Sequence, residues 1–173
     1  MTELSIRKAV EFDAHTLSEI GAATFIETFG HLYPQADLTA YLAVAYDVED
    51  TRLSLVSPSK ASWIVEDQGR VVGFATAGLC DLPHPEVGPQ SYELKRFYLL
   101  KSHQNGGTGS TLFGQVMAWL LAQNPKDLWI GVWSENLGAQ RFYKRHGFEQ
   151  VGEYGFKVGA TVDLEFILRR TVT

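Results

Sequence analysis

The sequence predicts a single α/β domain over residues 1–173, with a mixed sheet of about seven strands flanked by helices. Three observations lead to this fold class. The chain has 173 residues, which suits one domain, and 45% of them are hydrophobic, which is ample for one core. Apolar residues alternate in some segments and recur every three or four positions in others. A glycine-rich loop joins a strand pattern to a helix pattern, an arrangement common in α/β domains.

The first third of the chain has the pattern of one strand followed by helices. Residues 4–10 alternate between apolar and polar side chains and are expected to form a strand. A helix is expected from Asp13, because small and apolar residues recur at helical spacing, namely Leu17, Ile20, Ala23 (or Thr24) and Ile26. A second helix is expected over 36–46 and a short third one over 48–57, before Pro58.

The remaining two thirds alternate between strands and helices. Two strands, 61–67 and 70–80, are joined by the hairpin signal Asp67-Gln68-Gly69. Residues 81–90 contain three prolines and a glycine, which predicts a loop. The elements expected after that loop are strand 91–100, helix 110–123, strand 127–133, helix 136–146 and strands 148–156 and 161–169.

Composition argues against several classes of protein. The formal net charge is −5 without a long basic cluster, which argues against nucleic acid as the main ligand. The sequence has no signal-like start and no apolar run near 18 residues, so we expect a cytoplasmic protein without membrane contact. Cys80 is the single cysteine, and it fits a small buried hydrophobe better than a nucleophile. No histidine pair has metal-ligand spacing, so no metal is expected.

The glycine-rich loop has the features of an anion-binding site. Gly106, Gly107 and Gly109 allow successive backbone N–H groups to turn inward around phosphate oxygens. The N-terminus of the next helix adds partial positive charge, and Ser110 adds a hydroxyl group. With Gln104 at its start, the loop has the pattern Q-x-x-G-x-G.

Two familiar phosphate-binding loops do not match this stretch. A Walker loop requires a lysine, and none occurs between Lys101 and Lys126. A Rossmann fingerprint read from Gly107 requires a glycine at the position of Leu112. Asp127 begins a strand, whereas the ribose-binding acid of that fingerprint should end one.

A second motif lies in residues 133–148, WSENLGAQRFYKRHGF. Asn136 is expected to begin a helix, and Gly147 is a natural helix terminator. Phe142 fits a core aromatic. Tyr143 fits the core equally well, but its hydroxyl group needs a partner, so this pattern alone leaves core and function open.

Together, Q-x-x-G-x-G and N-x-x-A-x-x-F-Y-x-x-x-G-F resemble the two cofactor motifs of the GNAT acyltransferase superfamily. The segments TFIETF, LWIGVW, RFYKRHGF and GFKVGATVDLEFI are similar to bacterial PaiA-type spermine/spermidine acetyltransferases. The resemblance implies a GNAT-like fold with a splay between the fourth strand, 91–100, and the fifth, 127–133.

The resemblance also implies where acetyl-CoA binds. The backbone of Phe97, Tyr98 and Leu99 would pair with its pantetheine arm, and Asn136 would contact the arm from the other side. The residues expected around its pyrophosphate are Gln104, Asn105, Gly106, Gly107, Thr108, Gly109 and Ser110. Many loops of the family carry an arginine or lysine here. This loop carries none, so its affinity is expected to rest on backbone N–H groups and the helix dipole.

Acetyl transfer to an amine needs a neutral amine. At pH 7 an alkyl amine of pKa ~10.4 is neutral in about one molecule in 2,500, a cost of about 4.6 kcal/mol. By resemblance to histone-acetylating members, Glu93 is the candidate base, 11 residues before Gln104. It would need a pKa raised by burial, or a water relay. The alternative is a structural ion pair with Lys95 or Arg96.

Tyr143 is the candidate acid, because family analogues place a tyrosine beside the thioester sulfur. A thiol near pKa 8.5 is a stronger acid than tyrosine, so we expect Tyr143 mainly to hydrogen-bond the departing sulfur. The weaker candidates for the acceptor site are Glu27, Tyr33, His84 and Glu86.

The sequence therefore predicts an acetyl-CoA-dependent N-acetyltransferase acting on a small primary amine, with a polyamine such as spermidine as the expected acceptor. Acetylation of a protein N-terminus or lysine is the alternative within enzymes. A CoA-binding sensor without turnover is the alternative outside them. Assembly as a homodimer is left open.

Overall fold

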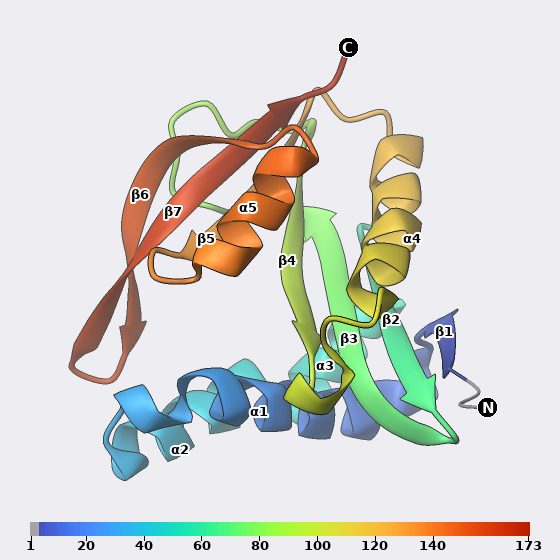
Figure 1. Cartoon of the computed structure of the whole chain (residues 1–173), viewed down its shortest axis with the longest axis vertical. Coiled ribbons are helices and arrows are strands. Elements are labelled where there is room, and N and C mark those ends of the chain that lie inside the picture. The colour runs from blue at the N-terminus through green and yellow to red at the C-terminus, as the bar shows by residue number, and fades with distance from the viewer. Residues whose placement is uncertain (1–3) are drawn as a thin grey trace.

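The structure is a computed structural model that describes residues 4–173. A seven-stranded sheet in the order β1-β2-β3-β4-β5-β7-β6 runs through the molecule (Figure 1). Among these strands β4 and β5 are parallel, and the other neighbours are antiparallel. The α/β fold class, the seven strands and the mixed sheet predicted from the sequence are confirmed.

The bounds of the elements follow the sequence patterns closely. The strands are β1 (Leu4–Lys8), β2 (Lys60–Asp67), β3 (Arg70–Leu79), β4 (Ser91–Leu99), β5 (Asp127–Trp133), β6 (Glu149–Val158) and β7 (Thr161–Thr171). The helices are α1 (Ala14–Phe29), α2 (Gln35–Ala45), α3 (Val48–Val56), α4 (Thr108–Ala122) and α5 (Leu137–Arg145). Short 3-10 turns lie at Glu11–Asp13, Gly30–Leu32 and Lys101–His103.

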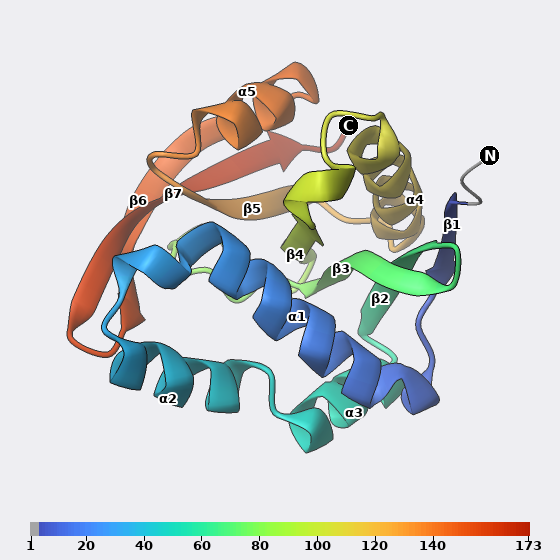
Figure 2. The same cartoon turned by 60° about the horizontal axis from the view of Figure 1, so that its bottom comes forward.

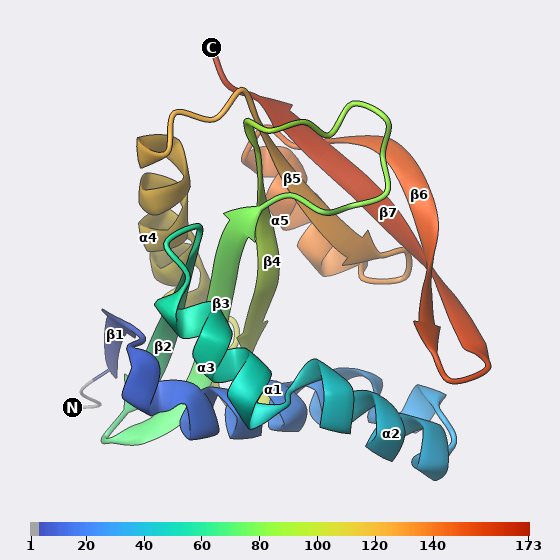
Figure 3. The ribbon, with the colours of Figure 1, turned by 180° about the vertical axis from the view of Figure 1, so that it is seen from behind.

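Helices cover both faces of the sheet. Figure 2 shows α1 and α2 on one side, and α4 and α5 on the other. The core under α4 and α5 is built around Phe113, Leu112 and Val116, and the core under α1 and α2 around Phe25 and Phe74. The predicted loop 81–90 passes over β5 and β7 on the side shown in Figure 3. The sheet therefore separates two chemically distinct sides of the molecule.

One of the apolar residues that recur at helical spacing in α1 does not face the core. The side chain of Ile26 is 47% exposed, because Phe25 and Phe29 occupy the helix face that meets the sheet. At the position left open, Thr24 rather than Ala23 is buried. The Thr24 hydroxyl donates to a backbone carbonyl one turn earlier, at 2.8 Å, which satisfies it inside the core.

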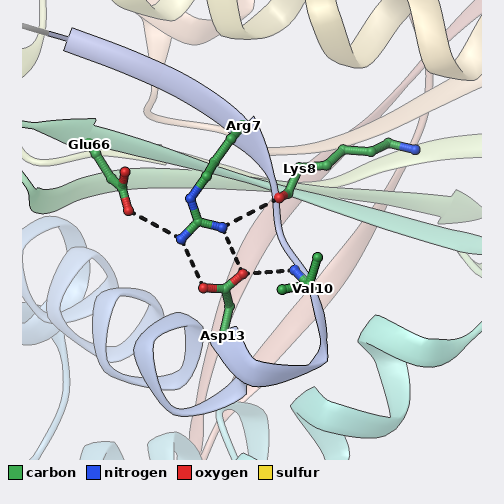
Figure 4. Close-up of polar contacts among 5 residues, drawn as sticks. All are labelled: Arg7, Lys8, Val10, Asp13 and Glu66. Carbon is green, nitrogen blue, oxygen red and sulfur yellow. Dashed lines mark hydrogen bonds and ion pairs between the residues drawn. The ribbon is translucent and has the colours of Figure 1, made fainter.

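An ion-pair cluster ties the start of α1 to the sheet (Figure 4). The Arg7 guanidinium donates two hydrogen bonds to the Asp13 carboxylate, at 2.8 and 2.9 Å, and a third to Glu66 at 3.2 Å. The hydrogen bonds from Arg7 lower the pKa of Asp13, which also accepts from the Val10 N–H at 2.7 Å. This bidentate contact links β1 to the residue that precedes α1.

The pairing of β4 with β5 stops halfway along both strands. It runs from Ser91 opposite Asp127 to Leu94 opposite Ile130. In Figure 1 the two strands then diverge toward the bottom of the view. On its other side β4 carries a β-bulge, because its register with β3 skips Lys95. A bulge bends its strand and increases the local twist, which favours this divergence. The predicted splay between the fourth and fifth strands is confirmed.

A buried polar network holds the closed end of the splay. The Asp127 carboxylate accepts from the Ser91 hydroxyl and from the Trp129 indole N–H, both at 2.6 Å. The Ser91 hydroxyl in turn accepts from the Gly88 N–H at 3.0 Å. All three polar residues of β4 and β5 in this network are buried, so each is satisfied by the others. The network fixes the register at which the strands begin to pair.

Candidate active site

A groove of about 620 Å³ lies between the diverging parts of β4 and β5. Eight of the residues predicted to bind acetyl-CoA line it: Phe97, Tyr98, Leu99, Gln104, Asn105, Gly109, Asn136 and Tyr143. The four other predicted residues, Gly106, Gly107, Thr108 and Ser110, lie beside it in the loop and in the first turn of α4. Segments far apart in the sequence thus meet at one opening.

The glycine loop fits an anion. Gly107 has φ +86°, a left-handed conformation that favours glycine, and it is the N-cap of α4. Within residues 4–173 no side chain caps this helix, so N–H groups of its first turn are left without an intrahelical partner. A Cβ at Gly107 would meet no atom within 4 Å, so the cradle is open. These free donors and the helix dipole suit a pyrophosphate.

The strand side of the groove fits an extended amide chain. After Leu94, β4 pairs with β3 on one edge and has no strand on the other. Backbone groups on that edge are available to an arm with its own amides, as pantetheine has. Gln104 donates from its side chain to the Leu99 carbonyl at 2.9 Å, which ties the glycine loop to the end of β4.

The groove is also lined by two cationic side chains that the sequence motifs did not reveal. Lys101 precedes the loop, and Arg145 lies in the last turn of α5. The expectation that affinity rests only on N–H groups and the helix dipole is therefore incomplete. The loop itself is neutral, but the fold brings positive charge from a separate helix.

Asn136 and Tyr143 enter the groove from α5. The Asn136 side-chain oxygen accepts from the Ala139 N–H at 3.1 Å and caps the helix. The Tyr143 ring is buried against Phe113 and Phe142, with centroids 6.2 and 5.6 Å away. Burial raises the pKa of Tyr143, so its hydroxyl stays protonated. The ring of Tyr143 thus packs in the core, and the residue also lines the groove.

A second cavity, of about 160 Å³, is lined in part by residues of α1 and α2. Its walls are mainly aromatic: Phe25, Phe29, Tyr33, Tyr41, Tyr46, Tyr98, Trp133, Tyr154 and Phe156. Its charged groups are Glu93, Lys95, Arg96, Asp163 and Glu165. Six residues line both spaces: Phe29, Lys95, Tyr98, Gly131, Trp133 and Glu165. This cavity and the groove therefore meet through the splay, and we name it the acceptor cavity after the acceptor site that the sequence predicts.

Glu93 is buried and lines the acceptor cavity. Its carboxylate accepts from Lys95 Nζ at 3.1 Å and from the Asp81 N–H at 3.2 Å. Burial raises the pKa of Glu93, and the Lys95 charge opposes that rise. The ion pair with Lys95 that the sequence offered as an alternative is therefore present. Arg96 instead donates to the Ala45 carbonyl at 2.9 Å.

Tyr33, one of the weaker candidates from the sequence, lines the acceptor cavity, and its hydroxyl donates to Asp163. Three others do not line this cavity. Glu27 accepts from the Lys101 N–H at 3.2 Å, beside the cofactor loop. His84 packs on Trp129, 5.0 Å between ring centroids.

Glu86 also lies away from the acceptor cavity, in an ion pair with Arg169 at 2.9 Å. The loop that carries His84 and Glu86 covers β5 and β7 instead of turning into the cavity (Figure 3). Burial raises the pKa of Cys80 to about 12, so its thiol is neutral and fits the structural role expected for it.

Three polar residues of the acceptor cavity were missed by the sequence analysis: Tyr154, Asp163 and Glu165. The Tyr154 hydroxyl donates to the Glu165 carboxylate at 2.6 Å. Burial raises the pKa of Glu165. A signal was available, because acidic residues at 163 and 165 alternate with apolar ones and so share one face of a strand.

The family model described as Acetyltransferase (GNAT) family matches residues 23–148, well over half of the chain. An uncharacterized N-acetyltransferase in the pepI 3′ region of Lactobacillus delbrueckii subsp. lactis is 27% identical over 172 residues, covering 99% of each chain. The protein belongs to the GNAT acetyltransferase family and is an N-acetyltransferase that uses acetyl-CoA.

Solved structures share the fold. The PaiA N-acetyltransferase of Thermoplasma acidophilum, in complex with coenzyme A, superposes with a TM-score of 0.77 at 18% identity, covering 98% of this chain and 99% of the other. The ribosomal-protein-alanine N-acetyltransferase of Brucella melitensis gives 0.66 at 22% identity, covering 97% and 99%. These likenesses concern the fold.

Two further findings bear on the class of protein. Within residues 4–173, no cluster of three or more His, Cys, Asp or Glu side chains is arranged to hold a metal ion. No helix in the described part of the chain is long and apolar enough to span a membrane.

The first prediction concerns the glycine loop. Gly107→Val is expected to weaken acetyl-CoA binding at least tenfold in calorimetry. The branched side chain strains a backbone at φ +86° and displaces the N–H groups that would face phosphate. Gly69→Val is the matched control, because Gly69 has φ +78° with open space around it and lies outside the groove. The control should lose similar stability and keep its affinity within about twofold. Equal affinity of the Gly107 variant and the wild type would contradict the loop's assignment.

Proposed function

We propose that the protein transfers the acetyl group of acetyl-CoA to a primary amine of a polyamine such as spermidine. The observation that carries the proposal is the acceptor cavity itself. It combines aromatic walls with two carboxylates, Asp163 and Glu165, which have no ion-pair partner within residues 4–173.

Organic cations match such a cavity for two reasons. An ammonium group is attracted to the faces of aromatic rings, with a gain that grows as water is excluded. Each additional ammonium group that leaves water also needs a negative partner. Asp163 and Glu165 are each hydrogen-bonded to a tyrosine hydroxyl, from Tyr33 and Tyr154, and remain available to further donors.

Acetyl-CoA supplies a thioester-bound acetyl group and a thiolate leaving group. We propose that the β4 edge from Phe97 to Leu99 holds the arm, that residues 104–110 hold the pyrophosphate, and that Asn136 orients the arm from α5. Tyr143 donates a hydrogen bond to the sulfur as negative charge develops there. A tyrosine hydroxyl is protonated at neutral pH, and burial raises the pKa of Tyr143 further, so it is available as a donor there.

Glu93 is proposed to help remove the proton of the acceptor ammonium through water. Its carboxylate faces the acceptor cavity, and burial raises its pKa toward the range useful for proton transfer. Glu93 lines the acceptor cavity but not the groove that would hold the acetyl group, so a water relay suits it better than direct contact. A cytoplasmic location and a homodimer stay predictions from the sequence.

The second prediction concerns the leaving group. Tyr143→Phe removes one hydroxyl and keeps the ring against Phe113, so the fold should hold. Loss of a hydrogen bond to a developing thiolate costs ~1.5–3 kcal/mol, or roughly 10- to 150-fold in rate. The loss should appear in kcat, with acetyl-CoA affinity unchanged within about twofold. Tyr92→Phe is the control, because Tyr92 lies on β4 outside both cavities. A wild-type kcat in the Tyr143 variant, with chemistry rate-limiting, would assign Tyr143 to the core alone.

The third prediction concerns the acceptor. Thiol release from acetyl-CoA should be at least tenfold more efficient, in kcat/KM, with spermidine than with a peptide bearing a free N-terminus. Asp163→Asn should lower kcat/KM for spermidine roughly tenfold and leave the affinity for acetyl-CoA unchanged, because one negative partner is lost. Preference for the peptide would favour protein N-terminal acetylation instead. Absence of thiol release with every amine and peptide would favour a binding protein without turnover.

A further inference from the structure

The junction between the groove and the acceptor cavity contains two charged side chains, Lys95 and Glu165. An amine that approaches the acetyl group from the acceptor cavity must pass this junction. Lys95 is already paired, with Asp81 at 2.9 Å and Glu93 at 3.1 Å. As a paired ammonium group it has no capacity to accept a proton. Glu165 is therefore the charged group at the junction that can act on an ammonium.

Gly131 makes room for Glu165 at this place. A Cβ on residue 131 would lie 3.1 Å from the Tyr154 hydroxyl and 3.3 Å from Glu165 Oε2, closer than ordinary contact. Because residue 131 of β5 has no side chain, the hydrogen-bonded pair of Tyr154 and Glu165 packs against the backbone of β5. Gly131 is the first residue of β5 after its pairing with β4 ends. Glu165 is paired across the ladder with Trp133, the last residue of β5.

The hydrogen bond to Tyr154 positions one carboxylate oxygen and leaves the other available. Tyr154 donates to Oε2 at 2.6 Å, a short charge-assisted contact that fixes the rotamer of the glutamate. Oε1 has no hydrogen-bond partner within residues 4–173. A carboxylate with one oxygen held and the other without a hydrogen-bond partner, on a residue that lines both spaces, can serve as a general base.

We propose that Glu165 is the group that takes the proton directly from the acceptor ammonium, with Tyr154 as its positioning residue. The proposal rests on the proposed amine acetylation. A proton moves from R–NH₃⁺ to the carboxylate, which gives R–NH₂ and a carboxylic acid. The nitrogen lone pair then forms the N–C bond while the C–S bond breaks and its electron pair leaves on sulfur. Of the three ammonium protons, one passes through Glu165 to solvent, one ends on sulfur and one stays on the amide.

The environment of Glu165 favours this role. Burial raises its pKa, the Tyr154 hydrogen bond opposes that rise, and the charge of Asp163 adds to it. Because the raised pKa of Glu165 lies closer to the pKa of the acceptor ammonium, proton transfer to it costs less free energy than transfer to an exposed glutamate. Glu93 lies close enough for its charge to raise the pKa of Tyr154 as well. It can receive the proton from Glu165 through water, as the relay proposed above requires.

The pH dependence follows from the charged state of Glu165. The titratable and charged groups that line its surroundings are Tyr33, Tyr41, Tyr46, Glu93, Lys95, Arg96, Tyr98, Tyr154 and Asp163. Below its raised pKa the Glu165 carboxyl is protonated and cannot accept a proton, so the rate is lost as pH falls through that value. Above it the carboxylate acts until the free amine itself becomes abundant and no longer needs a base.

The fourth prediction tests this assignment with Glu165→Gln. Positioned bases contribute 10²–10⁴-fold, so kcat/KM for spermidine should fall roughly 100-fold at pH 7 and recover to within about threefold near pH 10. An amine with a pKa below 7 is already neutral at pH 7, so the variant should acetylate it within about threefold of the wild type. That arm also shows that the variant is folded. Glu153→Gln removes an exposed charge next to Tyr154, outside both cavities, and should change neither rate more than twofold.

A second readout does not depend on turnover. Carboxyl carbon NMR of the ligand-free protein should show glutamate resonances from Glu93 and Glu165 that titrate above the ordinary glutamate pKa of ~4.3, and the one that is missing in Glu165→Gln belongs to Glu165. Its midpoint should match the pH at which the wild-type rate begins to exceed that of the variant. Acetyl-CoA affinity by calorimetry should stay within about twofold.

Several outcomes would overturn the assignment and leave the proposed function intact. One is a Glu165→Gln rate equal to wild type with spermidine at pH 7. Another is an equal loss with the weakly basic amine, which would indicate a structural role. A mismatch between the NMR midpoint and the rate profile would also reject it. If spermidine is not a substrate but a peptide amine is, the polyamine proposal fails, and the same comparison with the peptide still tests Glu165.

Discussion

The early end of the β4–β5 pairing is the constraint on which both candidate sites depend. The buried carboxylate of Asp127 fixes the register at one end, and the bulge at Lys95 turns β4 away at the other. Four paired positions hold the sheet together, and the unpaired remainder leaves a strand edge free. A continuous ladder would fill that edge and close the passage between the two faces. Because the ladder ends early, the later residues of β4 and β5 form no backbone hydrogen bonds with each other, and their free backbone groups can bind a ligand.

We propose that the passage lets groups from opposite faces act on one reaction. Tyr143 approaches from α5, where the ring is fixed by aromatic packing, and Glu165 approaches from β7, where Tyr154 and the bare backbone of Gly131 hold it. In our account the phenol stabilises the leaving sulfur and the carboxylate takes the amine's proton. Burial raises the pKa of both groups, so the same physical cause keeps one protonated and makes the other a better base.

Local signals in the sequence predicted the fold, and they selected residues that the structure brings together at one groove. The glycine loop and the segment around Tyr143 each occupy one strand–helix junction, so spacing along the chain is enough to recognise them. The acceptor cavity depends on which side of the sheet each segment covers, which spacing does not encode. Glu27 and Glu86 were expected there and lie elsewhere. The alternation at 163 and 165 could have indicated a shared strand face, but only the β5–β7 ladder brings Glu165 to the splay. Arg145 was missed for a similar reason, since only the packing of α5 turns its last helical turn toward the groove.

Backbone hydrogen exchange in the presence of coenzyme A tests the central claim most directly. If the splay is the cofactor site, coenzyme A should slow exchange of amides on the free edge of β4, between Phe97 and Leu99. It should also slow those at the start of α4, from Thr108 to Ser110. Amides of β4 between Ser91 and Leu94, already inside the β4–β5 ladder, should change little. Protection confined to surfaces outside the splay, with β4 and α4 unchanged, would contradict the account.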